Sequence, residues 1–423
     1  MSTLLVKNAL LDQKSVNVFC RDGLIEKINT DEIIADEILD AKGKTIHLPM
    51  INSHTHSSMT LFRGNGDDLP LMEWLTERVW PYESGIQDDE VYWGAKLAIL
   101  EMIRSGTVFF NDMYWKIQNV VKAVEEMGIR AMLALVWIDS GKKESIDQNK
   151  KMIEELYSEI NGKSDLIQFS LGPHAIYTVS EEGLRWIAEF ASDKKLNVHI
   201  HLSETEQEVK DCYKDHGCSP IDYLEKVGLL NNRLMAAHTV WLNDSDICKL
   251  GEHNVLCMHN PVSNMKLKVN SHYPYQKLKD AGAVTALATD GAGSNNNLDM
   301  FEEMKIAALL QKFCENKATE LPAAENIAMA TTNALGKFGL ETSGIKEGQR
   351  ADFILLDMDL PEMNPIFDLA SHLVYAANGN VVDSVVCNGK VLMKNRYIKG
   401  SEEIIENARE AAHNLFRRVD EVR

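Results

Sequence analysis

The sequence lacks the features of several large classes of protein. Its 423 residues contain no run of 18 or more apolar side chains, which argues against a membrane-spanning helix. Residues 1–8 include no basic segment followed by a long apolar core, so they do not resemble a secretion signal. The seven cysteines form no C-x-x-C pair, which disfavours a disulfide framework or a cysteine-based zinc site. We therefore expect a protein of the reducing cytoplasm.

Positive charge is also scarce. The 44 lysines and arginines are outnumbered by 63 aspartates and glutamates, which gives a formal net charge of -19. A surface that acidic repels polyanions, so neither nucleic acid nor an anionic membrane is an expected partner. Hydrophobic residues make up 45% of the chain and charged residues 25%, as in an ordinary globular protein.

Short β-rich runs lie near both ends of the chain. Their positions are 4–6, 16–19, 24–28, 351–357 and 382–387. The last run is followed by Asn388-Gly389, a strong hairpin signal. We predict that residues 1–48 and 345–400 together form a small β-sandwich domain, and that residues 401–423 form an exposed helix.

Between these ends, short apolar runs alternate with polar loops and amphipathic helices. The helical segments include 89–105, 180–193 and 220–227. A doubly wound open sheet is one interpretation, but its usual glycine-rich phosphate loop is missing. We therefore predict an α/β protein with a (β/α)₈ barrel over residues 49–344. The eight predicted strands are 45–51, 107–111, 130–136, 167–171, 197–202, 234–238, 255–258 and 284–288.

Residue types that bind metals follow the predicted strands, and in a (β/α)₈ barrel the active site lies at those carboxyl ends. His54 and His56 alternate, so both imidazoles project from the same side of an extended strand. With His201 and Asp290 they supply three imidazoles and a carboxylate, which suit Zn²⁺ or Fe²⁺ and leave a position for water. We predict that these four residues bind one divalent metal ion, most simply zinc. His199 could compete as a ligand, but a hydrogen-bonded core histidine is the preferred interpretation.

Other strand-end residues are candidates for chemistry. Glu204, three residues after His201, suits proton shuttling, although it could instead be a helix-start charge after a capping Ser203. His238 could orient the nucleophile or be a satisfied core histidine. Asp290 precedes a small polar loop in which Ser294 could approach a ligand, and a plain turn is the alternative.

Together these residues resemble the mononuclear, deaminase-like branch of the amidohydrolase superfamily. Strand 167–171 carries no lysine, whereas members with two metals usually supply a carboxylated lysine there, so the resemblance implies one metal. Within that branch the chain is similar to the 5-methylthioadenosine/S-adenosylhomocysteine deaminases. The shared stretches are 52–56, 59–64, 73–75, 80–83, 172–174, 261–267 and 294–300.

The resemblance implies a homo-oligomer, a dimer or tetramer, that converts an adenosine-type nucleoside to its inosine analogue and ammonia. It implies that Glu83 binds the ribose hydroxyls, that His174 contacts the nucleoside and that Arg130 helps to position it. The arginine that meets the amino-acid tail of S-adenosylhomocysteine in the family should fall within 140–149. This chain has Lys142 and Lys143 there, so 5-methylthioadenosine, 5'-deoxyadenosine and adenosine are the more expected substrates.

In the expected reaction Glu204 protonates the adenine ring nitrogen beside the attacked carbon, Asp290 accepts a proton and His238 orients the nucleophile. One alternative keeps this site but acts on guanine, cytosine or an s-triazine, none of which carries a ribose for Glu83 to bind. A second alternative is a non-catalytic scaffold of the same fold. The presence of all four ligand residues and Glu204 argues against that scaffold.

Overall fold

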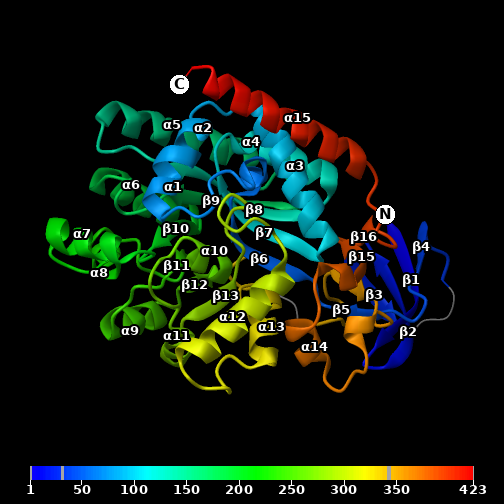
Figure 1. Ribbon diagram of the computed structural model, residues 1–423. Helices are drawn as coiled ribbons and strands as arrows, with labels where there is room; N and C mark the ends of the chain where they lie inside the picture. The colour runs from blue at the N-terminus through cyan, green and yellow to red at the C-terminus, as the bar shows by residue number, and fades with distance from the viewer. Residues whose placement is uncertain (1, 30–32, 341–343, 423) are drawn as a thin grey trace.

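A computed structural model describes residues 2–29, 33–340 and 344–422, in two sheets. The first is a nearly closed barrel of eight parallel strands that run in chain order from β6 to β13, with helices outside them (Figure 1). Its strands are β6 (Met50–Thr55), β7 (Thr107–Tyr114), β8 (Arg130–Trp137), β9 (Ile167–Pro173), β10 (Val198–Leu202), β11 (Leu234–His238), β12 (Leu256–His259) and β13 (Val284–Leu287). The predicted barrel is therefore confirmed.

The outer helices and a helical segment after β6 cover the barrel. Between strands lie α3 (Asp88–Arg104), α4 (Ile117–Met127), α5 (Lys143–Ile160), α6 (Glu181–Lys194), α7 (Glu206–His216), α8 (Pro220–Lys226), α9 (Asp244–Glu252), α10 (Pro261–Lys266) and α11 (Tyr275–Ala281). Two more, α12 (Met300–Cys314) and α13 (Ala323–Thr331), follow β13. The segment after β6 comprises η1 (Ser57–Phe62), α1 (Leu71–Trp74), the π-helical turn η2 (Leu75–Val79) and α2 (Trp80–Glu83).

The barrel closes between its first and last strands through site residues rather than through a ladder. The Asp290 N–H donates to the His54 carbonyl at 3.1 Å, and the Thr55 hydroxyl donates to the Asp290 carbonyl at 2.8 Å. Deeper in the seam, the Asn52 amide donates to the Thr289 hydroxyl at 2.7 Å. This closure places His54 next to Asp290, although 235 positions separate Thr55 from Asp290 in the chain.

The second sheet is mixed and combines strands from both ends of the chain. Its strands are β1 (Thr3–Leu11), β2 (Lys14–Arg21), β3 (Leu24–Ile28), β4 (Glu37–Asp40), β5 (Thr45–His47), β14 (Phe353–Leu356), β15 (Val382–Cys387) and β16 (Lys390–Met393). Asn388 and Gly389 both have positive φ between β15 and β16, as the hairpin signal predicted. A further short helix, α14 (Leu369–Tyr375), lies in the connection from β14 to β15.

One local prediction was wrong, and one alternative interpretation is excluded. The predicted strand 45–51 is two strands, because β5 pairs with β14 of the small sheet whereas β6 begins the barrel. Pro49 lies between them, and a residue without an N–H cannot continue a ladder. Ser203 does not cap the following helix. Thr205 does so, and its hydroxyl accepts the Glu208 N–H at 3.1 Å.

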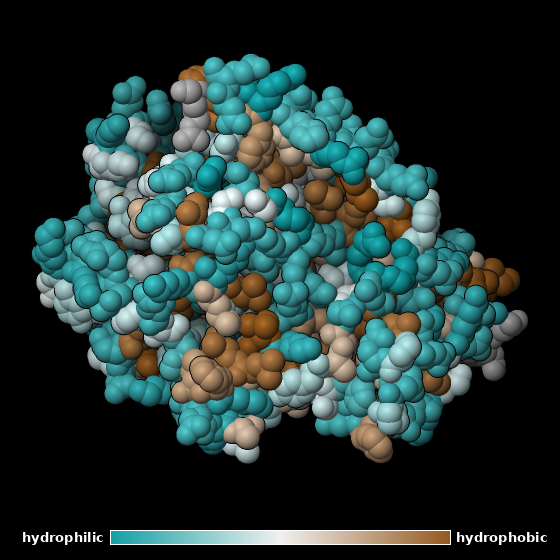
Figure 2. All heavy atoms as spheres, in the orientation of Figure 1, coloured by the Kyte–Doolittle hydropathy of each residue, from teal (hydrophilic) through white to brown (hydrophobic). Residues whose placement is uncertain are grey.

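The carboxyl-terminal helix α15 (Ser401–Asp420) is exposed on one side only. Its other side buries Ile404, Ala408 and Leu415, and the helix packs on α3 and η1. Figure 2 shows apolar atoms emerging where α15 crosses α3, and a second apolar patch lower on the same face. The helix also reaches the segment after β6, since the Tyr82 hydroxyl donates to Asp420 at 2.8 Å. No helix in the described ranges is long and apolar enough to span a bilayer.

Candidate active site and metal centre

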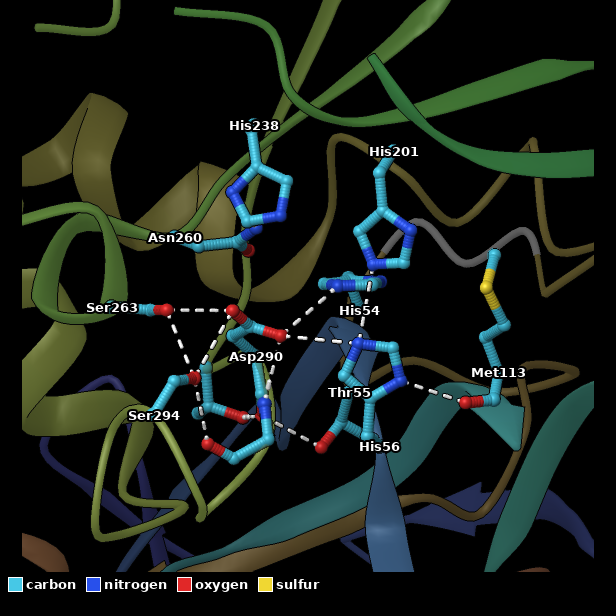
Figure 3. A network of polar contacts seen from close by, with 12 residues as sticks. His54, Thr55, His56, Met113, His201, His238, Asn260, Ser263, Asp290 and Ser294 are labelled. Carbon is cyan, nitrogen blue, oxygen red and sulfur yellow. Dashed lines mark hydrogen bonds and ion pairs between the residues drawn. The ribbon is translucent and has the colours of Figure 1, made fainter. Parts of the chain in front are cut away.

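Imidazole nitrogens and a carboxylate converge at the carboxyl end of the barrel (Figure 3). Oδ1 of Asp290 lies 3.2 Å from Nε2 of His54 and 3.3 Å from Nε2 of His56. Nε2 of His56 lies 3.2 Å from Nε2 of His201. The structure thus brings together all four residues that the sequence predicted as metal ligands.

Each of these histidines is oriented through its other ring nitrogen. Nδ1 of His56 contacts the Met113 carbonyl at 2.7 Å, and Nδ1 of His201 contacts the His174 carbonyl at 2.7 Å. Nδ1 of His54 lies 2.7 Å from Nε2 of His199. Such contacts orient the ring and direct Nε2 at the centre, as in known metal sites. His199 is therefore a hydrogen-bonded core histidine, as expected.

The residues present fit a divalent cation. Nε2 of His54 is buried and makes no hydrogen bond. Burial lowers the pKa of His54 to about 4 and that of His201 well below its usual range, so both imidazoles are neutral near pH 7. Burial opposes protonation of His56 too, but Asp290 beside it raises the His56 pKa to about 9. The Nε2 lone pairs of these histidines point at one another, and without a cation a proton stays among them. Such a cluster suits a cation, and its ligand types are those of zinc or iron.

Asp290 is held by three donors. Ser263 and Ser294 donate their hydroxyls to Oδ2 at 2.6 and 3.2 Å, and the Gly291 N–H donates to Oδ1 at 2.9 Å. Ser294 is buried and does not line the cavity described below. The expectation that Ser294 contacts a ligand is thus corrected, because its hydroxyl is directed at the carboxylate of Asp290.

Two further candidates face each other beside the cluster. Oε2 of Glu204 lies 3.8 Å from Nε2 of His238, and both side chains are buried. Nδ1 of His238 lies 2.8 Å from Oδ1 of Asn264 and 3.2 Å from Nδ2 of Asn260, so these two amides orient the ring with Nε2 towards Glu204. Burial raises the pKa of Glu204, so its protonated form persists to higher pH than that of an exposed glutamate.

A cavity opens over these groups. One wall is apolar and comes largely from the segment after β6. The other wall contains the polar residues His56, His174, His201, Glu204, His238 and Asp290. The apolar side chains are Leu71, Trp74, Leu75, Val79, Trp80, Val136, Ile138 and Leu267. Its apolar lining and its few convergent polar groups suit a small, largely apolar ligand.

Glu83 and His174 also line this cavity. The Trp115 indole N–H donates to Oε2 of Glu83 at 3.4 Å, and burial raises the pKa of Glu83. Nδ1 of His174 contacts the Thr178 hydroxyl at 3.1 Å, and burial lowers the pKa of His174 to about 3. His174 is therefore a neutral imidazole with one nitrogen already engaged.

Arg130 is a correction to the predicted site. It begins β8, and its Nε donates to Asp352 at 2.9 Å while Nη2 donates to Asn388 at 2.9 Å. The amino ends of the strands lie opposite the active site, so Arg130 joins the barrel to the small sheet instead of contacting the cavity. Lys143 also lies outside the cavity, because its ammonium pairs with Glu182 at 2.6 Å on the surface.

Several residues of the site were missed by sequence reasoning. Ser263 and Asn264 belong to the stretch 261–267, which carried the resemblance but no assigned role. Their partners Asp290 and His238 are 27 and 26 positions away. The apolar wall was also missed, since Leu71 and Trp80 stand in an irregular helical segment without a simple period.

Known proteins share this architecture. A model of the amidohydrolase family matches residues 49–392. The chain belongs to the amidohydrolase family. The resemblance drawn from the sequence is confirmed. Two overlapping groups of side chains lie close enough to hold a metal ion, His54 with His56 and Asp290, and His54 with His201 and His238.

Two relatives of this amidohydrolase match most of its length. A 5'-deoxyadenosine deaminase of Methanoregula boonei is 46% identical over 91% of this chain and 87% of that protein. A 5-methylthioadenosine/S-adenosylhomocysteine deaminase of Archaeoglobus fulgidus is 43% identical over 97% of this chain and 99% of that protein. An adenosine deaminase structure from Xanthomonas campestris with bound zinc has a TM-score of 0.89 at 30% identity and covers 98% of both chains.

Proposed function

We propose that this amidohydrolase is a metal-dependent deaminase that hydrolyses the 6-amino group of an adenosine-type nucleoside, giving the inosine analogue and ammonia. The observation that carries the proposal is that one cavity contains both the His/Asp cluster with Glu204 and, on its wall, the carboxylate of Glu83. The first set suits hydrolysis at a ring carbon, and Glu83 can accept two vicinal hydroxyls. The names of the relatives support the same reaction.

His54, His56, His201 and Asp290 would hold the metal, and we propose zinc, which the Xanthomonas campestris structure contains. When bound, it lowers the pKa of a water molecule and so makes a nucleophile available at neutral pH. Elemental analysis of the purified protein would distinguish zinc from iron. A protein without any transition metal, and without metal-stimulated activity, would instead favour a non-catalytic scaffold.

The proposed proton transfers use residues that face the cavity. Asp290 accepts the proton of the attacking water, and Nε2 of His238 accepts a hydrogen bond that aligns the nucleophile with C6 of adenine. Glu204, whose burial favours the protonated form, donates a proton to the ring nitrogen next to C6. The proton held by Asp290 then passes to the amino group, which leaves as ammonia, while the hydroxyl proton on C6 returns to Glu204 and leaves a carbonyl at C6.

The cavity also favours certain 5'-substituents. No lysine or arginine is among its lining residues in the described chain, whereas Glu83, Glu204 and Asp290 are. The carboxylate of an S-adenosylhomocysteine tail would therefore find no cation, while the apolar wall suits a methyl or methylthio group. We propose that 5'-deoxyadenosine and 5-methylthioadenosine are better substrates than adenosine or S-adenosylhomocysteine.

We infer further that the protein works in the cytoplasm as a dimer or tetramer. The cysteines support a reducing compartment, since all seven lie in the described ranges and none is in a disulfide. The oligomer is an inference from the family alone. Light scattering after size-exclusion chromatography would test it.

The decisive experiment is a substrate panel with the zinc-loaded protein. Ammonia release and the ultraviolet shift from adenine to hypoxanthine would be recorded for 5'-deoxyadenosine, 5-methylthioadenosine, adenosine, S-adenosylhomocysteine, guanine and cytosine. We expect turnover of the adenosine compounds, in the order that the apolar wall predicts. Turnover of guanine or cytosine alone would replace the nucleoside by a free base as substrate.

A further inference from the structure

A second buried glutamate, Glu208, lies on the first turn of α7, behind Glu204. Its side chain is 6% exposed, and it is not among the lining residues of the cavity. Its two carboxylate oxygens accept the consecutive backbone N–H groups of Ser203 and Glu204, each at 2.8 Å. Glu208 therefore contacts the backbone that carries Glu204 and no surface that a substrate reaches.

Capping of α7 does not account for this arrangement. Thr205 is the N-cap and binds the Glu208 N–H through its hydroxyl. In a capping box, a glutamate at this position binds the N–H of the N-cap residue itself. Here the carboxylate reaches past Thr205 to the two residues before it, which belong to the active-site loop.

The loop that Glu208 holds has a strained backbone. Ser203 has φ of 51°, in the left-handed region that residues other than glycine seldom adopt. Its carbonyl accepts the N–H groups of Val240 at 3.0 Å and Trp241 at 2.8 Å, just after His238. The Ser203 carbonyl is thus bound by the segment after His238, and the N–H groups of Ser203 and Glu204 are bound by Glu208 of α7. Such strain persists only where neighbouring groups enforce it.

We propose that Glu208 is a positioning residue that fixes the backbone at Ser203 and Glu204 so that the Glu204 carboxyl enters the cavity facing His238. The proposal rests on the proposed function, because it assigns Glu204 to proton transfer. Burial raises the pKa of Glu208 to about 7, and the hydrogen bonds from the two backbone N–H groups oppose that rise because they stabilise the carboxylate. A residue needed only to fill space would not direct both of its oxygens at these two N–H groups.

The test is a double-mutant cycle of Glu208→Gln and Glu204→Gln. In the Glu208→Gln variant, the glutamine amide keeps the shape but offers one acceptor, so one of the two backbone N–H groups loses its partner. We expect kcat to fall about 10- to 100-fold, as for a misplacement of about 1 Å, with KM changed less than about twofold. Metal content and the unfolding temperature should stay close to wild type.

In the Glu204→Gln background, Glu208→Gln should cost less than about threefold more, because the residue it positions is already disabled. Glu206→Gln is the matched control, since Glu206 lies on the same helical turn but is exposed and pairs only with Lys210. That control should keep wild-type kcat. If Glu208→Gln does not yield folded, metal-loaded protein, Glu208→Asp replaces it in the cycle, since its shorter carboxylate cannot reach both N–H groups.

Three results would overturn the proposal. Wild-type kcat in the Glu208 variant would mean that Glu204 needs no such support. Losses that multiply in the double variant would make Glu208 a general stabiliser of the fold. A metal-loaded wild-type protein that deaminates none of the adenosine compounds would overturn the proposed function, and this proposal with it. The first two results leave the proposed function intact, so the two failures are distinguishable.

Discussion

At the scale of single residues, the site divides the work of each imidazole between its two nitrogens. Nδ1 of His56, His201 and His238 binds a carbonyl oxygen of the protein, and Nε2 faces the cavity. This division fixes the orientation of each ring before any ligand arrives. Asp290 is divided in the same way, since Oδ2 accepts the Ser263 hydroxyl and Oδ1 lies beside the histidines.

Replacing Glu204 by glutamine should separate chemistry from metal binding. We expect kcat for 5'-deoxyadenosine to fall about 10²- to 10⁴-fold, the range for loss of a general acid, because an amide cannot deliver the proton. Metal content should not change, since Glu204 is not one of the four ligands. Steady-state kinetics and elemental analysis on the same sample would check both. A variant with near-normal turnover would remove Glu204 from the reaction.

Replacing Glu83 by glutamine should affect substrates that carry ribose. A carboxylate accepts hydrogen bonds from both ribose hydroxyls, whereas a glutamine amide has one acceptor oxygen and no charge. The value of kcat/KM for 5'-deoxyadenosine should therefore fall at least about 10-fold, which corresponds to the loss of one charged hydrogen bond. Binding of free hypoxanthine, which has no diol, should change less than about twofold. Competition assays would measure the binding of both compounds, and an equal loss for base and nucleoside would contradict ribose recognition.

At the scale of elements, the sequence predicted the barrel well because strand ends and ligand types coincide. His54, His201, His238 and Asp290 each follow an apolar run, and a parallel barrel collects such positions at one rim. The sequence did not separate the two strands that meet at Pro49 and belong to different sheets. Contacts between loops, such as Glu208 with the backbone of Ser203, have no periodic signal and could not be predicted.

The hairpin between β15 and β16 offers a prediction about backbone conformation. Gly389 has φ of 71°, and a methyl group there would approach the backbone of Gly23 to 3.3 Å. Gly389→Ala should therefore cost more than the ~1–2 kcal/mol expected for a left-handed alanine. Gly162 has φ of 70° with open space around it, so Gly162→Ala should show the backbone cost alone. Urea unfolding would compare them, and equal losses would refute the contact with Gly23.

At the scale of the whole molecule, Arg130 connects the two sheets. Its guanidinium is 2% exposed and binds Asp352 and Asn388 of the small sheet from the start of β8. The sequence placed this residue at the substrate because the family resemblance suggested it. Its position at the amino end of a strand, which the strand prediction already contained, indicates the opposite face of the barrel.

Replacing Arg130 by methionine should therefore destabilise the fold and spare catalysis. Leaving Asp352 without its partner should cost about 3–5 kcal/mol, as for other buried ion pairs broken on one side. KM should stay within about twofold. Lys143→Met removes an exposed ion pair and should cost less than about 1 kcal/mol. Chemical denaturation with parallel kinetics would decide, and a raised KM at unchanged stability would return Arg130 to the substrate.

A metal bound between the first and last strands of the barrel would have a structural role as well as a chemical one. His54 and His56 lie at the end of β6, Asp290 follows β13, and the described structure joins these two strands by isolated bonds and not by a ladder. A cation bound from both sides would link β6 to β13 across this junction. Release of the ion and separation of the two strands would then be one linked equilibrium, in which free metal favours the closed barrel and distortion of the barrel lowers the affinity for the metal.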